Sequence, residues 1–433
     1  MQVIRHILKY ISFFLGSIIL LTCFLVLSAR IPQSAIKENV MESAEYLCEG
    51  ELFRTVVKDV QGSKIDRYAD SILVAIAWQY DSFHPLQSVM WSSYYHTEYY
   101  NENRNLLNAV TNEYKPNQQY MRYWHGSIAI LRPLLVLFNI RQIYILNGGI
   151  MIILILCLMA VLLKNRMIIP AVGISAGLIL TSFWFVPLSL EYTWTYQFML
   201  LMSIIGVKLA LSGKWNYMGV YFLIGGIVTN YLDFLTTETL TLTVPLLLIC
   251  WVKLHESKNM QESSIWKMSG RAVLSWVAGY IGMWIMKWIL AAAVLRENVM
   301  PYVSEHIGER LGGDIGLSWW NYICGAVWKN ISCMFPFEYG VVGMFAGIIL
   351  VLFVVYSGYV YHRKHICKEN ILLYSLIGIV PYIRYIVLHN HSYLHCFFTY
   401  RAQFATILAI VLIMEQLSDW RWLVHDNNRR RKS

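Results

Sequence analysis

The sequence predicts an all-α fold, a polytopic membrane helical bundle of about ten spans with one large outer loop, residues 30–141, after the first span. Hydrophobic residues make up 57% of the 433 residues and charged residues 14%, whereas a soluble protein carries about 25% charged residues. Apolar runs of about 20 residues, enough to cross a bilayer, recur along the chain. They are continuous rather than alternating, which predicts helices and argues against a β-barrel.

The predicted spans are residues 11–29, 142–163, 167–188, 192–211, 217–232, 240–252, 272–295, 339–361, 371–388 and 403–417. The fifth and sixth are short for a crossing and could instead form one re-entrant hairpin. Every short loop on the predicted inner side carries basic residues. Basic residues mark the cytoplasmic side of a membrane. Arg5 and Lys9 therefore place the N-terminus inside and the large first loop outside.

This pattern gives the organisation of the chain. It divides into the inner N-terminus and first span (1–29), the outer first loop with juxtamembrane helices (30–141), spans two to seven (142–295), a second outer loop (296–337), the last three spans (338–417) and a basic cytoplasmic tail (418–433). The net charge of +9 gathers at loop ends and in the tail, which indicates membrane edges rather than a nucleic-acid partner. We expect a bacterial plasma-membrane protein with both termini cytoplasmic.

The first outer loop carries three helix patterns. Apolar residues at 36, 40, 44 and 47 follow helical spacing, which predicts an amphipathic helix lying on the membrane surface. Residues 71–78 predict a second helix. Residues 128–138 form an apolar run interrupted by Arg132-Pro133, which predicts a juxtamembrane helix before the second span. The loop is therefore expected to be folded.

Two acids in this loop are the candidate catalytic residues. Asp66 and Asp70 are four residues apart, which places both carboxylates on one face of a helix. A carboxylate near a dry membrane surface can act as a general base, with its pKa set by burial and neighbours. The alternative is that Asp70 caps a helix that starts at Ser71. The two interpretations are compatible, because a capping residue can also face a cleft.

A second candidate cluster follows in residues 120–135. Arg122, His125 and Arg132 lie among aromatic residues, a set that could hold a sugar by stacking and a phosphate by charge-assisted hydrogen bonds. The alternative is an aromatic belt at the level of the lipid headgroups. A belt explains Tyr123 and Trp124 better than it explains the three basic residues.

A third cluster, residues 229–238, places Asp233 and Glu238 between two apolar runs. Ionisable residues at membrane depth are costly, so both are candidate binding residues. The alternative is a polar turn that ends the fifth span. Lys287, within the seventh predicted span, could bind a phosphate, but we expect its side chain to extend to the membrane surface.

The fourth cluster lies at the outer ends of the last two spans. His389, His391 and His395 have a spacing that could supply three zinc ligands. We favour a second interpretation, in which Arg384, His391, His395 and Arg401 form a cationic patch for a lipid-linked phosphate or pyrophosphate. No metal site is assigned, although a divalent metal stays possible.

Several common motifs are missing from the sequence. It contains no Walker A loop, no Rossmann glycine pattern, no GxSxG and no HExxH. It also has no Asp-x-Asp pair of the type that soluble nucleotide-sugar transferases use. These absences argue against cytosolic nucleotide chemistry.

The architecture resembles the GT-C superfamily of membrane glycosyltransferases, which take sugars from polyprenyl-phosphate donors. The shared features are a short inner N-terminus, a large acidic first outer loop with amphipathic helices, about ten spans and a basic cluster at the outer ends of the late spans. The stretches similar to bacterial envelope proteins of this type are residues 66–72, 122–126, 132–135 and 391–401.

The resemblance implies a function. An acidic residue of the first outer loop is the usual base of this superfamily, and Asp66 and Asp70 match it, with Asp70 slightly favoured. The donor phosphate is then expected near Arg384, His391 and Arg401, and the acceptor is a cell-envelope glycan or lipid. Two other functions stay open: a flippase or exporter of lipid-linked oligosaccharides, and a polymerase of them.

Overall fold

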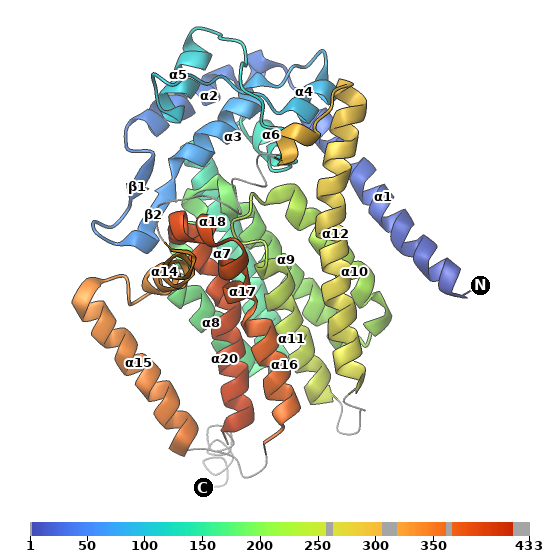
Figure 1. The fold of residues 1–433 in the computed structure, drawn as a ribbon, viewed down its shortest axis with the longest axis vertical. Coiled ribbons are helices and arrows are strands. Elements are labelled where there is room, and N and C mark those ends of the chain that lie inside the picture. The colour runs from blue at the N-terminus through green and yellow to red at the C-terminus, as the bar shows by residue number, and fades with distance from the viewer. Residues whose placement is uncertain (1, 257–262, 305–317, 361–365, 419–433) are drawn as a thin grey trace.

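The computed structural model describes residues 2–256, 263–304, 318–360 and 366–418. It contains a bundle of long helices and, at one end of it, a smaller helical layer formed by residues 30–139 (Figure 1). We call this layer the first-loop domain. The predicted basic tail beyond residue 418, the basic run 362–365 and part of the second outer loop, 305–317, lie outside the described residues.

Seven described helical segments are long and apolar enough to cross a membrane. They are Leu8–Ala29, Ile140–Lys164, Leu190–Leu211, Ser264–Leu295, Gly340–Tyr359, Lys368–Val387 and Cys396–Leu417. The protein is therefore a multi-pass membrane protein, and the predicted all-α class is confirmed. The predicted count of ten spans is not confirmed. The third, fifth and sixth predicted spans correspond to helices that are shorter than the roughly 20 residues needed for a crossing.

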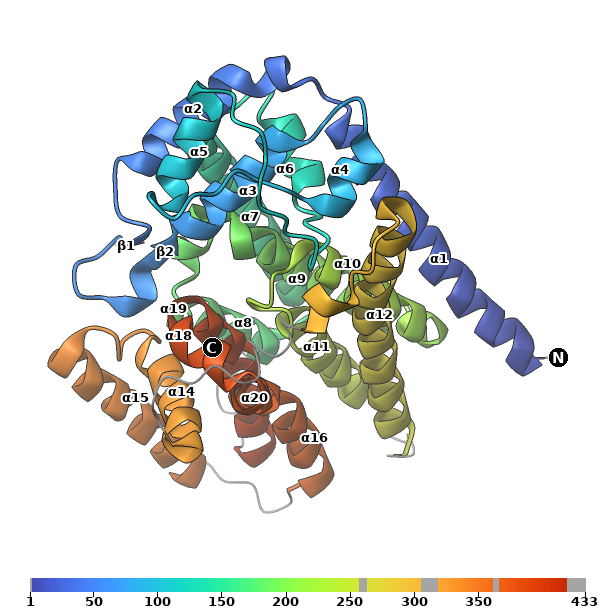
Figure 2. The ribbon, with the colours of Figure 1, turned by 45° about the horizontal axis from the view of Figure 1, so that its top comes forward.

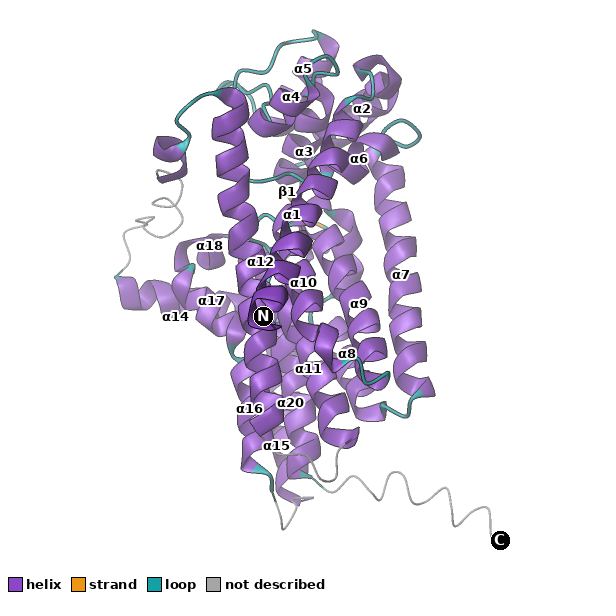
Figure 3. Ribbon diagram, turned by 90° about the vertical axis from the view of Figure 1, so that its right-hand side faces the viewer, coloured by secondary structure: helices purple, strands orange, loops and turns teal. Residues whose placement is uncertain are grey.

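The bundle consists of the following helices, seen from the side in Figure 3: α1 (Gln2–Ala29), α7 (Ile140–Lys164), α8 (Ile168–Leu180), α9 (Leu190–Leu211), α10 (Met218–Leu232), α11 (Leu240–Glu256), α12 (Ser263–Leu295), α15 (Gly340–Val360), α16 (Lys368–Gly378), α17 (Val380–Val387) and α20 (Phe404–Leu417). The ninth predicted span is divided into α16 and α17. The division falls at Pro381, since proline has no amide hydrogen to continue the helical hydrogen bonds.

The first-loop domain contains α2 (Gln33–Cys48), α3 (Arg67–Gln79), α4 (Pro85–Trp91), α5 (Glu102–Thr111) and α6 (Ile128–Leu134), as Figure 2 shows. The three helices predicted in this loop are thus confirmed. The predicted position of the first on the membrane surface is wrong. The apolar face of α2 is fully buried against α5, α3 and α7, so it contacts protein and not lipid.

A short antiparallel strand pair was not expected from the sequence. Strand β1 (Phe53–Thr55) pairs with β2 (Lys64–Asp66), and Phe53 lies opposite Asp66. Three-residue strands carry too short an alternation to be recognised in a sequence. The pair matters here because β2 leads directly into α3 and so fixes the position of Asp66.

The first-loop domain is fastened to the bundle by α12. The Lys287 side chain is fully buried, and its Nζ donates to the backbone carbonyls of Val89 (3.0 Å) and Met90 (3.1 Å). The expected extension of Lys287 to the membrane surface is therefore wrong. The C-terminal end of α4 leaves carbonyls without helical donors, and the buried ammonium group donates to two of them.

The last part of the chain returns to the boundary between the two layers. Helices α14 (Trp319–Ser332), α18 (His389–Leu394) and α19 (Cys396–Thr399) lie beside one another below the first-loop domain (Figure 1). A 3-10 turn, Tyr400–Gln403, then leads into α20. This arrangement of short helices brings His391 and His395 next to residues of the first-loop domain.

Candidate functional site

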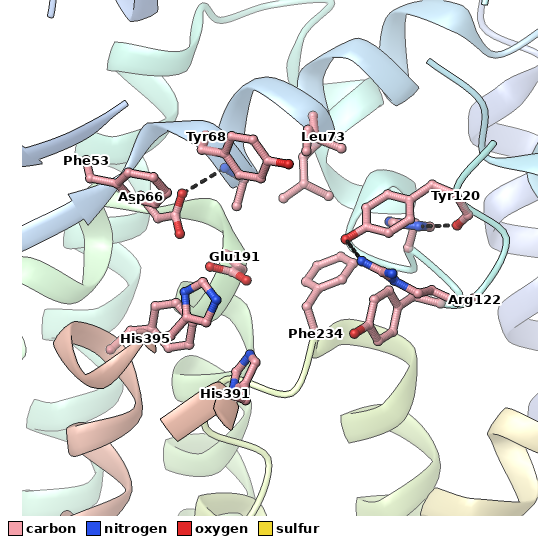
Figure 4. A pocket seen from close by; sticks show the side chains of 15 residues that line it. Phe53, Asp66, Tyr68, Leu73, Tyr120, Arg122, Glu191, Phe234, His391 and His395 are labelled. Carbon is pink, nitrogen blue, oxygen red and sulfur yellow. Dashed lines mark hydrogen bonds between the residues drawn. The ribbon is translucent and has the colours of Figure 1, made fainter. Parts of the chain in front are cut away.

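A pocket of about 410 Å³ lies where the first-loop domain meets the bundle (Figure 4). Six segments of the chain line it: β1, the β2–α3 junction with the start of α3, residues 120–125, the start of α9, the turn between α10 and α11, and α18 with α19. Five of the predicted site residues come together here, namely Asp66, Arg122, His125, His391 and His395. The volume falls within the range of about 300–1,000 Å³ that small-molecule sites occupy.

Asp66 contributes a buried carboxylate to the pocket. It is the N-cap of α3, and its Oδ1 accepts a hydrogen bond from the Ala69 amide at 2.8 Å. Because α3 begins at Arg67, the alternative that Asp70 caps this helix is wrong. Burial raises the pKa of Asp66 to about 7, against an opposing effect of its hydrogen bonds.

Glu191, in the first turn of α9, is the second carboxylate of the pocket, and the sequence analysis missed it. Its side chain lies near that of Asp66 (Figure 4), and its influence lowers the pKa of Asp66 against the larger effect of burial. The two acids therefore do not titrate independently of each other. The available signal was an acid at the edge of an apolar span, the kind of residue that defaults to a functional candidate.

Asp70 lies one turn beyond Asp66 on α3, but it does not line the pocket. Its side chain is fully buried, and Oδ1 accepts from the Leu190 amide (2.8 Å) and the Ser189 hydroxyl (3.2 Å). Its other oxygen accepts from the Tyr144 hydroxyl. Burial raises the pKa of Asp70 to about 8. Asp70 therefore binds the start of α9, the segment that carries Glu191.

The opposite wall of the pocket is cationic and aromatic (Figure 4). The guanidinium of Arg122 lies 4.5 Å from the centre of the Tyr120 ring and 5.3 Å from that of Tyr123. Its Nη2 donates to the Tyr120 hydroxyl at 3.0 Å. Stacking leaves the edge of a guanidinium able to meet an anion, which suits a phosphate or carboxylate ligand.

His125 is a neutral member of this wall. Its Nε2 donates to the Tyr120 carbonyl at 2.8 Å, and burial lowers the pKa of His125 to about 3. Its backbone has φ of +52°, a strained conformation for a residue with a side chain. Strain of this kind concentrates at functional sites.

His391 and His395 lie one helical turn apart beside Glu191 (Figure 4). Their ring centres are 4.8 Å apart, and His395 stacks on Phe398 at 5.3 Å. His389, the third residue of the zinc spacing, instead bonds the Ile386 carbonyl. Within the described ranges, no group of three or more His, Cys, Asp or Glu side chains is arranged to hold a metal ion.

Two of the predicted arginines form hydrogen bonds with the backbone and do not line the pocket. Arg132 and Arg401 are both fully buried. Their acceptors are backbone carbonyls, those of Ile31, Ala77 and Tyr80 for Arg132 and those of Phe397 and Gly62 for Arg401. Arg132 thereby joins the end of α1 to the end of α3.

The remaining predicted residues form a polar layer below the pocket. Asp233 accepts from the amide and hydroxyl of Thr236, at 2.9 and 2.6 Å, and so holds the turn between α10 and α11. Glu238 forms a buried ion pair of 2.5 Å with Arg384. The alternative of a polar turn thus describes Asp233, while Glu238 and Arg384 join α11 to α17.

An apolar groove of about 510 Å³ adjoins the pocket and shares Arg122 and Tyr123 with it. One wall is an aromatic ladder on α12, formed by Trp276, Tyr280, Trp284 and Trp288. Successive ring centres are 4.9, 5.7 and 6.0 Å apart. At the helical rise of 1.5 Å per residue, the ladder extends about 18 Å. Its four-residue spacing is visible in the sequence, but its place beside the pocket is not.

Comparison with known proteins identified no relative of this chain. No protein family, no characterised protein and no solved structure matches the chain. The function must therefore be inferred from the pocket, the groove and the membrane setting. These three features place paired carboxylates, a cation and an apolar surface within one connected space.

Proposed function

We propose that this protein is a GT-C-like membrane glycosyltransferase that moves a sugar from a polyprenyl-phosphate donor to a cell-envelope glycan or lipid. One observation carries the proposal. A polar pocket with a carboxylate pair on one side and Arg122 on the other adjoins an apolar groove, and Arg122 belongs to both. A lipid-linked sugar phosphate has the matching order of parts: apolar tail, anionic phosphate and polar sugar.

The donor phosphate is placed at Arg122. A guanidinium binds phosphate through two parallel hydrogen bonds, and the stacked Tyr120 and Tyr123 rings hold it in position. The tail then runs along the α12 ladder, and the sugar enters the pocket against the tyrosine rings, where aromatic faces suit the apolar faces of a sugar. His391 and His395 supply further donors at the carboxylate side.

The carboxylate pair activates the acceptor. In its ionised form Asp66 takes the proton of an acceptor hydroxyl, and the hydroxyl oxygen bonds to the anomeric carbon while the bond from that carbon to the phosphate oxygen breaks. Arg122 stabilises the charge that develops on the leaving phosphate. A single displacement inverts the anomeric configuration. Glu191, which lies near Asp66, lowers the pKa of this base.

The proposal includes an orientation. Lys164, Lys208 and Lys214 lie at helix ends away from the first-loop domain. By the positive-inside tendency this end is cytoplasmic, so the pocket faces the outer side of a bacterial plasma membrane. The acceptor then arrives from the cell envelope.

The exporter alternative depended on charged residues along a path through the bundle. Lys287 donates to the carbonyls of Val89 and Met90, and Arg384 pairs with Glu238. Both charges thus hold parts of the fold together, which favours the transferase. A polymerase would use the same pocket with a pyrophosphate-linked oligosaccharide, so the choice of donor distinguishes it.

The test is a transfer assay with the full-length protein in lipid nanodiscs. Radiolabelled polyprenyl-phosphate-linked glucose and mannose, and a polyprenyl-pyrophosphate-linked oligosaccharide, serve as donors, and sugar release from the lipid is measured with envelope extract as acceptor. We expect release from a monophosphate donor, and a loss of about 10²–10⁴-fold in Asp66→Asn. Glu51→Gln, an exposed acid of the same domain, is the matched control. Full activity of folded Asp66→Asn would remove Asp66 as the base, and release only from the pyrophosphate donor would indicate the polymerase.

A further inference from the structure

A second groove lies between α1, α10 and α12, toward the end of the bundle away from the first-loop domain. Its volume is about 920 Å³. Phe14, Leu223, Leu274 and Ala278 give it an apolar wall. Neither the pocket nor the aromatic ladder shares residues with it, so its occupant is a separate question.

The rim of this groove is cationic. Lys267 and Arg271 line it, both exposed, and neither pairs with an acidic side chain among the residues that the structure describes. The three helices that form the groove contain no aspartate or glutamate at all. No acidic residue of these helices therefore neutralises the positive charge of the rim, which favours an anionic ligand.

The rim is also closely packed. A Cβ atom added at Gly219 would come within 1.8 Å of the Tyr10 hydroxyl and 3.3 Å of Arg271 Cδ. Glycine at this position thus leaves room for the Tyr10 and Arg271 side chains against α10. Tyr10 also lines the groove, so a phenol hydroxyl is present among its walls besides the two cations.

The positions of Lys267 and Arg271 along α12 indicate their depth in the membrane. The helix rises about 26 Å between Arg271 and Trp288, the neighbour of Lys287, which bonds to the first-loop domain. The hydrocarbon core of a bilayer is about 30 Å thick. Lys267 and Arg271 consequently lie near the headgroups of the leaflet opposite the pocket, with the groove running from them into the acyl region.

We infer that this groove binds an anionic phospholipid, with its phosphate at Lys267 and Arg271 and an acyl chain along the apolar wall. Basic pockets between membrane helices recognise anionic headgroups in this way. The inference is independent of the proposed transferase activity, because it uses neither the carboxylate pair nor Arg122.

The test uses full-length protein in detergent and measures lipid binding by native mass spectrometry, with phosphatidylglycerol and phosphatidylcholine of equal chain length. We expect phosphatidylglycerol to bind more tightly, and the double variant Lys267→Gln/Arg271→Gln to bind it about 30-fold more weakly. Lys208→Gln/Lys214→Gln removes the same charge at the same end of the bundle and is expected to leave binding unchanged. Ala278→Trp fills the apolar wall and is expected to reduce binding without a change in charge.

Three results would overturn the inference. They are equal binding of the two lipids, equal loss in both double variants, and unchanged phosphatidylglycerol binding in Ala278→Trp. Circular dichroism and monodispersity of each variant show whether it is folded. Transfer activity measured on the same samples keeps a failure of the lipid site distinct from a failure of the proposed function.

Discussion

The carboxylate of Asp70 accepts a hydrogen bond of 2.8 Å from the backbone amide of Leu190, the residue before Glu191. Asp70 also accepts from the Ser189 hydroxyl. The first turn of α9 leaves amides without helical partners, and a buried carboxylate on α3 supplies one of the missing acceptors. This contact sets α9 against α3 so that Glu191 meets Asp66 in the pocket.

The first prediction concerns this contact. Asp70→Ala is expected to destabilise the protein by about 2–4 kcal/mol, because the Leu190 amide and the Ser189 and Tyr144 hydroxyls lose a buried acceptor. A lower thermal midpoint in detergent is the measurement. Asp66→Asn is the control, since asparagine also caps helices well. If Asp70→Ala kept the wild-type midpoint, Asp70 would not hold α9 in place.

The second prediction concerns stability and pH. The pKa values of Asp66 and Asp70 are raised to about 7 and about 8, above the value of about 4 for an unfolded chain. Between these limits the folded state binds more protons than the unfolded state, so stability falls as pH rises. We expect the thermal midpoint to decrease from about pH 5 to pH 8.

The double variant Asp66→Asn/Asp70→Asn checks the origin of this slope. It should flatten the decrease, although not abolish it, because the pKa of Glu338 is also raised, to about 7, by burial. A variant with the full wild-type slope would show that other groups cause it. The exposed Glu51→Gln serves as the control with no expected change.

The third prediction concerns the pH dependence of transfer. Activity should rise as Asp66 ionises, near pH 7. The interaction with Glu191 lowers the pKa of Asp66, so the Glu191→Ala variant should move the rising limb of kcat/KM to higher pH. Glu191→Gln can still donate a hydrogen bond and should restore part of the shift. An identical pH profile in Glu191→Ala would separate Glu191 from the base.

The fourth prediction concerns the aromatic ladder. Trp284→Ala should raise KM for a donor with a long polyprenyl chain and leave KM unchanged for an analogue with a short prenyl chain. The expected factor is about tenfold, since the half-buried Trp284 side chain would contribute about 1.4 kcal/mol in apolar contacts with the tail. Trp328→Ala, which removes an exposed tryptophan of α14, is the control. Equal effects on both donors would place the tail elsewhere.

The sequence was sufficient for part of this description. Continuous apolar runs predicted an all-α membrane protein, and the helical spacing of residues 36 to 47 predicted α2. The lengths of α10 and α11 were also visible, but whether a short apolar helix crosses a membrane depends on the helices around it. Sequence spacing carries no information on that packing.

The same limit applies to the site. Arg122 and Arg132 look alike in the sequence, each among aromatic and apolar residues near a span. The structure turns Arg122 into the pocket and Arg132 onto the carbonyls of Ile31 and Tyr80. Whether an arginine bonds to backbone carbonyls depends on segments that are distant from it in the sequence. The paired carboxylates required α3 and α9 to be packed together, which no local pattern specifies.

The contacts between the first-loop domain and the later parts of the chain have a consequence for synthesis. Lys287 bonds to Val89 across 198 residues, and the Tyr400 hydroxyl bonds to the Gly62 carbonyl across 338. Contacts this far apart form only after the intervening chain has been made and inserted. A nascent chain that ended before α18 would hold Asp66, Glu191 and Arg122 but lack one wall. The ribosome must therefore release nearly the whole polypeptide before the site can exist.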